Sequence, residues 1–564
     1  MILRLLRLGM KLPAARYRAQ MELHFVPMRD GVRLATWHVW PVGDESPLGT
    51  LLIRTPYGVR GSRSLTGMTG RLLAELGYHV VLQDVRGRYA SEGQFVPFEA
   101  ERNDGRDTMD WVLQQPWSGG QPIGLLGASY LAYTAWCVLA EAPEHVGAIV
   151  SWIGSGDLYS TFYRGGALAM HNALEWGLLV GDKETLSARQ LDLERGLAHR
   201  PVREADRVAL RSVDWIRDWL DHPRKDAYWA ALEAELPEKI PPVLSMAGLY
   251  DFFLPSQMEQ YDQLIAAHHN ERAVQPRLIL GPWAHGVPAK VSWWRKGLGG
   301  VALREAIAHF DRHLCSRDSI QTPAPVQYFL PGSEAWQVSQ SWPPENSHRR
   351  PCFLDADAGT GRLSWEEPDD DSTPLRFEHD PNEPTPAIGG PLFGWKGGVK
   401  DQSGLESRND ILLYDSEPLE NDLTLTGPVC LSIEIETDVE DFDVTGKLID
   451  VAPNGRAENV CEGIQRARWR DLKAEGAEPS FLEPGQAIRI QADLGQAVRT
   501  FRRGHRIRLV VGGSNFPSFD RNPSSRLEPA CAQTADFRIS RPSIHHGKDR
   551  RSWLELWVRA SEED

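Results

Sequence analysis

The stretch IGLLGASYLAYTAWCVLAEA, residues 123–142, decides the fold of this chain. Its first eight residues form an apolar run that ends in small residues, which is typical of a buried strand, and the remainder has the composition of a helix. Ser129 lies at the turn between them, with Gly127 two residues before it. A serine in a sharp strand-to-helix turn projects as a nucleophile, and small neighbours let strand and helix pack closely. Leu131 fills the last glycine position of GxSxG, so this segment alone also fits an ordinary structural serine.

Strands and helices alternate on both sides of this segment. Buried strands are predicted within residues 49–58 and 71–87, the second one after a helix, and another helix is predicted within residues 103–117. Further along the chain, residues 301–314 also have a helical pattern. Strands that alternate with helices predict a parallel sheet that helices cover on both faces.

The strand pattern is interrupted once and then resumes. Residues 157–236 are helix-like and rich in Leu, Arg and Trp, whereas residues 240–251 and 276–286 again have the pattern of buried strands. An interrupted and resumed sheet is typical of a core domain that carries an inserted cap. The segment 157–236 is therefore predicted to be a helical cap.

The last part of the chain has a different pattern. Pro, Asp, Glu and Ser dominate residues 337–390, and short alternating strands separated by turns follow at regular spacing. Such spacing predicts an antiparallel β-sandwich. A length of 564 residues accommodates about three or four domains. We predict an α/β core, a cap and an all-β domain, divided as 1–156 (core, first part), 157–236 (cap), 237–345 (core, second part) and 346–564 (β-sandwich).

The composition excludes some classes of protein. Apolar residues make up 41% and charged residues 25%, which excludes disorder of the whole chain, and the net charge of −15 argues against nucleic acid as the main partner. The longest apolar run in residues 1–13 is three residues, so we expect an amphipathic arm packed on the body and no membrane partner. No CxxC pair is present, so we expect a cytoplasmic protein with reduced thiols. The cysteines are Cys137, Cys315, Cys352, Cys430, Cys461 and Cys531.

A serine nucleophile needs a base to take its proton and an acid to orient that base. In this kind of fold those groups follow later strands, in the chain order Ser, Asp, His. The strand at 242–248 is followed by LYD, which places Asp251 at its carboxyl end, and the strand at 277–283 is followed by AHG, which places His285 at the equivalent end. The ligand crevice of an open parallel sheet lies at these ends. We predict a triad of Ser129, Asp251 and His285, with a helix N-cap and an ordinary loop histidine as the common alternatives.

Longer motifs are spread over nearly the whole chain after residue 22. Through them the chain resembles the cocaine esterase and α-amino acid ester hydrolase group, which is related to the Xaa-Pro dipeptidyl peptidases. The motifs are VPMRDGVRLA (26–35), RTPYG (54–58), QDVRGRYASEGQFVP (83–97), GASYLAYT (127–134), DLYSTFYRGGAL (157–168), GLYDFF (248–253), GPWAHG (281–286), FDRHL (310–314), DFDVTGKLIDVAPNGRA (441–457) and GHRIRLVVGGSNFPSFDRN (504–522).

The resemblance implies an α/β-hydrolase core with an inserted helical cap, followed by a C-terminal jelly roll of the Xaa-Pro dipeptidyl-peptidase type. It also implies that the hydroxyl of Tyr57 donates to the oxyanion beside the backbone N–H of Tyr130, which stabilises a developing alkoxide more than a ground-state carbonyl. An ordinary turn tyrosine is the alternative for Tyr57. Members usually carry Gly three residues after the serine, and this chain has Ala132 there.

The resemblance also bears on the acyl pocket. In α-amino acid ester hydrolases, carboxylates two and three residues after the catalytic Asp bind the substrate ammonium, whereas this chain has Phe253 and Leu254 at those positions. Phe162 or Tyr163 and Trp176 occupy the positions of the aromatic pocket walls in the cocaine-esterase-like pattern. An ammonium group would be desolvated there without a partner. We therefore expect an uncharged apolar or aromatic acyl group, with a plain aromatic cap core as the alternative.

These features predict a serine hydrolase that cleaves carboxylic esters, and amides by extension, through an acyl-enzyme intermediate on a small-molecule substrate. An Xaa-Pro dipeptidyl-peptidase-like or α-amino acid ester or amide hydrolase is one alternative, and a non-catalytic binding protein is an alternative of another class. We expect no cofactor and no metal, because His313 and the pairs His268–His269 and His545–His546 lack metal-ligand spacing with acidic partners. The C-terminal domain is expected to support the core and to close one wall of the pocket.

Overall fold

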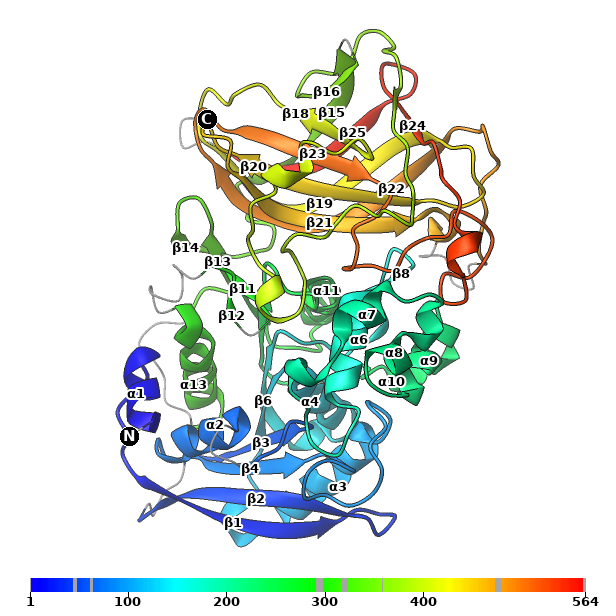
Figure 1. The fold of residues 1–564 in the computed structure, drawn as a ribbon. Helices are drawn as coiled ribbons and strands as arrows, with labels where there is room; N and C mark the ends of the chain where they lie inside the picture. The colour runs from blue at the N-terminus through cyan, green and yellow to red at the C-terminus, as the bar shows by residue number, and fades with distance from the viewer. Residues whose placement is uncertain are drawn as a thin grey trace.

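The computed structural model describes residues 2–43, 48–60, 64–285, 287–290, 298–315, 323–357, 359–471 and 478–560. A ten-stranded sheet forms the lower half of the molecule in Figure 1, below a second, larger β-structure. In spatial order its strands are β1 (Arg18–Pro27), β2 (Arg33–Val42), β4 (His79–Asp84), β3 (Thr50–Thr55), β5 (Ile123–Ala128), β6 (Val146–Trp152), β9 (Val243–Gly248), β10 (Arg277–Gly281), β13 (Val326–Leu330) and β14 (Ala335–Ser339).

The central strands, from β4 through β13, pair in parallel, and their carboxyl ends meet at one edge. Successive residues of β3 pack on opposite faces of the sheet. Leu52 joins the apolar cluster around α3 (Glu101–Leu113) and α4 (Tyr130–Glu141), whereas Leu51 joins the cluster around α2 (Leu65–Ala74) and α13 (Val301–His313). A period of two with both faces apolar is what a parallel sheet covered by helices requires. The predicted α/β core is confirmed.

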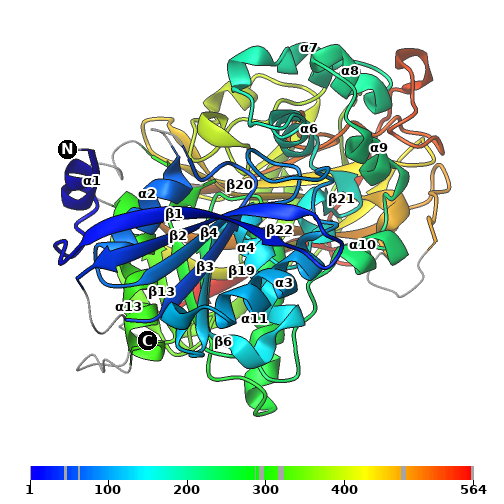
Figure 2. The same ribbon diagram turned by 90° about the horizontal axis from the view of Figure 1, so that it is seen from below.

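One hairpin at the sheet edge lies outside the sequence prediction. β1 and β2 pair antiparallel over their full length, and β2 continues antiparallel onto β4. Figure 2 shows this hairpin at the edge of the sheet that is nearest the viewer. β1 is partly exposed and carries polar residues at alternate positions, so its apolar signal is weak. Before β1, the helix α1 (Ile2–Gly9) packs on α2, and its Arg7 binds Glu75 at 2.6 Å.

A helical cap is inserted between β6 and β9, beside the carboxyl edge of the sheet (Figure 1). Its helices are short and are joined by irregular segments and one two-stranded ribbon. The elements are α5 (Tyr159–Phe162), β7 (Tyr163–Arg164), β8 (Ala167–Leu168), α6 (Met170–Leu179), α7 (Leu193–Ala198), α8 (Ala205–Ala209), α9 (Asp214–Asp221) and α10 (Ala227–Leu232). After β9, the helix α11 (Leu254–His269) returns along the sheet and contacts both α5 and β9.

The C-terminal part is an all-β sandwich, as predicted, with its apolar core between layers. Its eleven strands, counted over the described residues, include long antiparallel pairs such as β19 with β22. The strands are β15 (Ser347–Asp357), β16 (Thr360–Ser364), β17 (Leu375–Arg376), β18 (Ile411–Asp415), β19 (Leu423–Glu436), β20 (Asp443–Val451), β21 (Ala457–Arg466), β22 (Ile488–Phe501), β23 (Arg506–Gly512), β24 (Ser543–His545) and β25 (Ser552–Arg559).

Buried charges join the sandwich to the cap. Arg466 pairs with Asp443 at 2.9 Å and with Asp520 at 3.0 Å, and Asp520 also accepts the backbone N–H of Leu168 from the cap at 2.9 Å. All three charged side chains are almost fully buried. Removing one member of such a group would leave an uncompensated buried charge, so the network fixes the sandwich against the cap.

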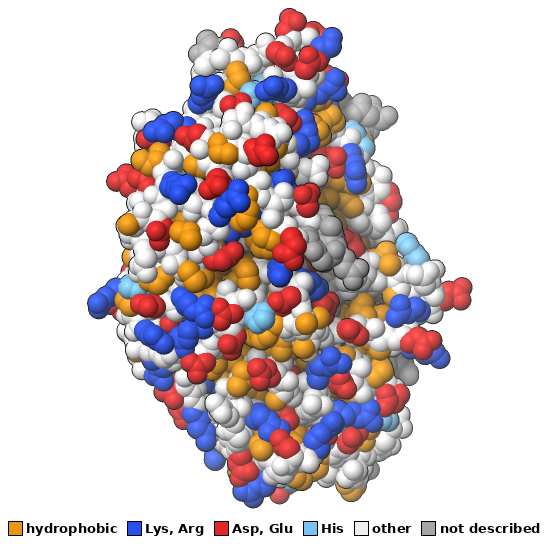
Figure 3. All heavy atoms as spheres, turned by 90° about the vertical axis from the view of Figure 1, so that its right-hand side faces the viewer, with side chains coloured by type: hydrophobic (Ala, Val, Ile, Leu, Met, Phe, Trp, Pro, Cys, Tyr) orange, Lys and Arg blue, Asp and Glu red, His pale blue; other side chains and the backbone are white. Residues whose placement is uncertain are grey.

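The surface shows no strong bias of charge on the face that Figure 3 presents, where Lys and Arg side chains alternate with Asp and Glu. Within the described residues, no helix is both long and apolar enough to cross a membrane. The six cysteines all lie in the described part of the chain and form no disulfide.

Candidate active site

Ser129 occupies a strained turn between β5 and α4. Its backbone has φ 58° and ψ −129°, a conformation that few non-glycine residues adopt. A Cβ atom at Gly127 would lie 2.0 Å from the carbonyl oxygen of Leu131, so only glycine fits there. The methyl group of Ala132, where the family usually has glycine, faces Gly154, which has no side chain. The absence of a side chain at Gly154 therefore leaves room for the extra methyl group of Ala132.

The three predicted triad residues lie in one chain of hydrogen bonds. His285 Nε2 lies 2.9 Å from Ser129 Oγ, and His285 Nδ1 lies 2.9 Å from Asp251 Oδ2. Asp251 is 2% exposed, and its other carboxylate oxygen accepts the backbone N–H of Phe253 at 2.8 Å. Because the carboxylate is held from both sides, it fixes the orientation of the imidazole. Each residue follows a different parallel strand, β5, β9 and β10, at the same edge of the sheet.

Two potential oxyanion donors lie beside Ser129. Tyr130 begins α4, and the N–H groups of a first helical turn have no partner within the helix. Tyr57 follows β3, and its hydroxyl oxygen accepts the indole N–H of Trp176 at 2.9 Å. Burial raises the pKa of Tyr57, and hydrogen bonds with Trp176 and Ser129 offset only part of this shift. Tyr57 therefore keeps its proton and can donate it in a hydrogen bond.

Comparison with known proteins shows the family of the chain. Over 569 residues the chain is 32% identical to the cocaine esterase of Rhodococcus sp. (strain MB1 Bresler). The matched region covers 94% of this chain and 97% of that protein. The chain belongs to the cocaine esterase family. Residues 30–287 match the X-Pro dipeptidyl-peptidase (S15) family, and residues 318–555 match the X-Pro dipeptidyl-peptidase C-terminal non-catalytic domain.

Solved structures share the fold of nearly the whole chain. An α-amino acid ester hydrolase superposes with a TM-score of 0.81 at 24% identity, covering 97% of this chain and 98% of its own. An aminopeptidase from the marine sediment archaeon Thaumarchaeota archaeon gives a TM-score of 0.82 at 23% identity with the same coverage. At these identities the likeness concerns the fold, and it confirms an α/β-hydrolase core with a cap and a C-terminal β-domain.

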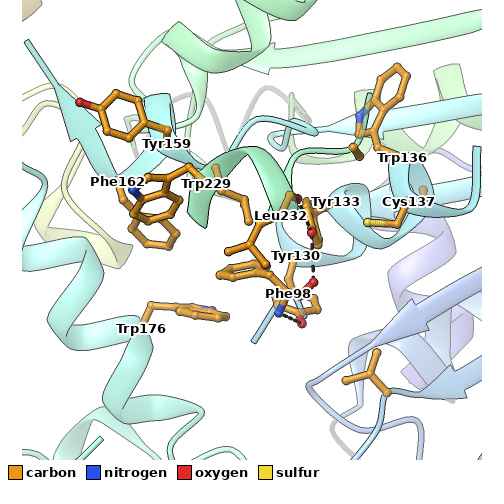
Figure 4. Close-up of a cluster of buried hydrophobic side chains, with 14 of the residues drawn as sticks. Phe98, Tyr130, Tyr133, Trp136, Cys137, Tyr159, Phe162, Trp176, Trp229 and Leu232 are labelled. Atoms are coloured by element: carbon orange, nitrogen blue, oxygen red, sulfur yellow. Dashed lines mark hydrogen bonds between the residues drawn. The ribbon is translucent and has the colours of Figure 1, made fainter. Parts of the chain in front are cut away.

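An aromatic cluster lies where the cap meets the core. Trp176 of the cap stacks on Phe98 (ring centroids 5.5 Å apart) and on the ring of Tyr130 (5.7 Å), and Phe162 stacks on Trp219 at 4.3 Å. Figure 4 shows Trp176, Phe98 and Tyr130 facing one another across this boundary. Two of the residues predicted for the pocket wall, Phe162 and Trp176, thus belong to one cluster next to the candidate oxyanion donors Tyr57 and Tyr130.

Tyr163, the other residue considered for this wall, lies elsewhere in the cap. Its ring stacks on Tyr159 with 5.5 Å between the centroids, and its hydroxyl donates to the carbonyl of Trp219 at 2.9 Å. Its strand β7 contacts β21 of the sandwich. Tyr163 therefore packs at the boundary between cap and sandwich, and Phe162 is the one whose ring approaches Trp176.

Three phenylalanine rings surround the imidazole of His285. Phe252 lies 4.5 Å from it between centroids, Phe393 lies 5.3 Å from it, and Phe253 lies 5.8 Å from it. Phe253 was predicted for the acyl pocket, whereas Phe252 and Phe393 were not. Phe393 comes from the sandwich, more than a hundred residues after His285, so no local signal could place it here.

Other residues of the family motifs make structural contacts. Arg86 pairs with Asp104 at 2.6 Å, and Ser91 donates to the carbonyl of Asp84 at 2.6 Å. A Cβ at Gly87, which has φ +70°, would lie 2.1 Å from the backbone nitrogen of Phe95. Within the described ranges, no group of three or more His, Cys, Asp or Glu side chains is arranged to hold a metal ion.

Proposed function

We propose that this protein is a serine hydrolase that cleaves carboxylic esters through an acyl-enzyme intermediate. The observation that carries the proposal is the hydrogen-bonded line from Ser129 Oγ through His285 to Asp251, with 2.9 Å at each step. Nucleophile, base and orienting acid in such a line are what acyl transfer requires. Membership of the cocaine esterase family supports the same reaction.

In the proposed reaction, Ser129 Oγ attacks the ester carbonyl while its proton passes to His285 Nε2. The carbonyl oxygen becomes an alkoxide, which accepts hydrogen bonds from the Tyr57 hydroxyl and the Tyr130 N–H. The tetrahedral intermediate then expels the alcohol, which takes the proton from His285, and the acyl group remains on Ser129. Water repeats the sequence, with His285 as base, and releases the carboxylic acid.

The acyl group is proposed to be uncharged and bulky. Phe253 and Phe393 place aromatic rings beside the triad histidine, and Leu254 is also apolar. A substrate ammonium group in such surroundings would lose its hydration without gaining a carboxylate partner. Because Phe393 belongs to the C-terminal sandwich, we also propose that this domain closes one wall of the pocket.

Two other reactions fit the family and are distinguished by substrate. The match of residues 30–287 to the S15 family is compatible with an Xaa-Pro dipeptidyl peptidase. The chain also shares its fold with an α-amino acid ester hydrolase. Both would need to hold a free α-ammonium group. A paired assay with p-nitrophenyl esters and Xaa-Pro anilides tests this choice: we expect faster turnover of the esters, and faster turnover of the anilides would reverse the assignment.

A fluorophosphonate probe tests the reaction class, including the alternative of a non-catalytic binding protein. The probe should label the folded protein and should fail to label Ser129→Ala. The same substitution should reduce kcat by about 10⁶. No labelling of the folded wild-type protein, or equal labelling of Ser129→Ala, would contradict the proposal.

A further inference from the structure

The predicted oxyanion donor Tyr57 is held from the cap as well as from the core. Trp176 lies on the cap helix α6 and donates its indole N–H to the Tyr57 hydroxyl oxygen at 2.9 Å. Trp176 is 7% exposed, and its ring packs against those of Phe98 and Tyr130, which also stack on each other. The donor of this hydrogen bond therefore cannot turn away without unpacking the aromatic cluster.

This hydrogen bond constrains where the Tyr57 proton can point. A phenol has one O–H donor, and its oxygen can also accept. When the indole N–H occupies the accepting side, the O–H is left to donate in another direction. The Ser129 side chain interacts with the same hydroxyl and offsets part of the rise in the pKa of Tyr57. Donation from Trp176 also polarises the O–H bond, because successive hydrogen bonds strengthen one another. Both effects favour a hydrogen bond to an oxyanion formed at Ser129.

Arg88 links the two segments that carry this pair. Its Nε donates to the carbonyl of Pro56, directly before Tyr57, at 2.8 Å, and its Nη1 donates at 2.8 Å to the carbonyl of Val180, directly after α6. The same side chain also reaches the carbonyl of Asp182 and, at 2.9 Å, the hydroxyl of Thr185. The guanidinium is fully buried and flat, so it spans both segments in one fixed geometry.

We propose that Trp176 and Arg88 are positioning residues that couple the cap to the oxyanion hole: Arg88 sets helix α6 against the Tyr57 loop, and Trp176 orients the Tyr57 hydroxyl. The inference rests on the proposed ester hydrolysis, since it assigns these residues to the same site. The oxyanion hole is complete only when the cap is in the position seen here. The cap thus contributes to catalysis as well as to the shape of the pocket.

The test is a double-substitution cycle measured on p-nitrophenyl esters. Tyr57→Phe removes one oxyanion donor and should lower kcat by about 10²–10³, with little change in KM. Trp176→Phe should lower kcat by about five- to tenfold, the range expected for one uncharged hydrogen bond. In the Tyr57→Phe background the hydroxyl is absent, so adding Trp176→Phe should change kcat less than twofold. Equal losses in both backgrounds would overturn the role of Trp176.

A second variant guards against unpacking of the cluster. Replacing Trp176 with benzothienylalanine keeps the bicyclic ring and substitutes sulfur for the N–H, and it should give the same loss of kcat as Trp176→Phe. Trp219→Phe is the matched control, because the Trp219 ring packs in the same cluster, with its centroid 6.1 Å from that of Trp176, and its side chain interacts with Tyr228. Its effect should be the same in both Tyr57 backgrounds. A benzothienylalanine variant with wild-type kcat would also overturn the proposal.

Arg88 is tested by Arg88→Gln, which keeps a donor and shortens the reach. We expect kcat to fall at least tenfold, and we expect the further effect of Trp176→Phe to shrink, because the two residues serve one geometry. If the effects of Arg88→Gln and Trp176→Phe on kcat are additive, Arg88 does not position the Tyr57 hydroxyl through Trp176. Fluorophosphonate labelling of Ser129 separates a failure of the proposed hydrolase from a failure of this inference. If the wild-type protein is not labelled, the hydrolase is refuted. If the wild type is labelled and Trp176→Phe has the wild-type kcat, only the role of Trp176 is refuted.

Discussion

The Asp251→Asn substitution tests the proposed triad most directly, because it changes one atom and leaves the volume unchanged. In the wild type, one Asp251 oxygen accepts the Phe253 N–H and the other lies 2.9 Å from His285 Nδ1. An asparagine that keeps the contact with the Phe253 N–H must turn its NH₂ group toward Nδ1. The imidazole then carries its proton on Nε2, which donates to Ser129 Oγ and can no longer take the proton of the nucleophile.

The expected loss follows from this tautomer. A triad whose histidine is held in the wrong tautomer loses about 10⁴ in kcat, or about 5 kcal/mol of transition-state stabilisation. The burial of Asp251, at 2% exposed, leaves little water to restore the native arrangement. Initial rates with p-nitrophenyl benzoate give kcat and KM, and we expect KM to stay close to the wild-type value because the acyl pocket is untouched.

Asp262→Asn is the matched control. Asp262 is an exposed residue of α11, the helix that follows Asp251, and its substitution should leave kcat unchanged. Thermal unfolding of both variants shows whether they are folded. If folded Asp251→Asn keeps more than a tenth of the wild-type kcat, Asp251 does not orient the base and the assignment of the acid is wrong.

The other predictions concern selectivity, pH and the sandwich. The kcat/KM of benzoyl or medium acyl esters should exceed that of α-amino acid esters at least about tenfold. Phe253→Asp should reduce this preference. Equal kcat/KM values for phenylacetyl and phenylglycyl esters in the wild type would contradict an apolar acyl pocket. Burial lowers the pKa of His171, His379 and His546 to about 4 and that of His38 and His309 to about 3. Because the folded state binds fewer protons than the unfolded state, its stability is complete above about pH 6.5 and falls as the pH drops toward 3; urea midpoints that are equal at pH 7.5 and pH 5 would refute this. A chain that ends at residue 345 loses Phe393 and the partner of the cap, so it should aggregate; a soluble, monomeric and fully active fragment would show that the sandwich is dispensable.

The fold was predictable because its strands are apolar on both faces and end at turn residues. Those strand ends also led to Ser129, Asp251 and His285, since parallel strands bring their carboxyl ends to one edge whatever lies between them in the chain. The hairpin of β1 and β2 was missed for the opposite reason. It lies at the edge of the sheet, where one face meets solvent and polar residues at alternate positions dilute the apolar pattern.

Contacts between domains were not predictable from local pattern. Nothing near Phe393 in the sequence indicates that its ring lies 5.3 Å from that of His285, because the approach depends on how the sandwich docks on the cap. The hydrogen bond of Trp176 was also outside the sequence prediction. Its aromatic ring suggested a pocket wall, whereas the direction of its N–H toward Tyr57 depends on the exact placement of α6.

The three parts of the chain therefore act on the site in different ways. The core supplies the proposed triad from strand ends, the cap contacts the Tyr57 hydroxyl through Trp176, and the sandwich contacts the imidazole through Phe393. Since the cap is bound to the sandwich through Asp520 and Leu168, a shift of the sandwich would move both contacts together. Substitutions at the buried Arg466–Asp520 pair should thus alter kcat, although neither residue lies near the substrate. Such an effect would show that the docking of the sandwich on the cap affects catalysis.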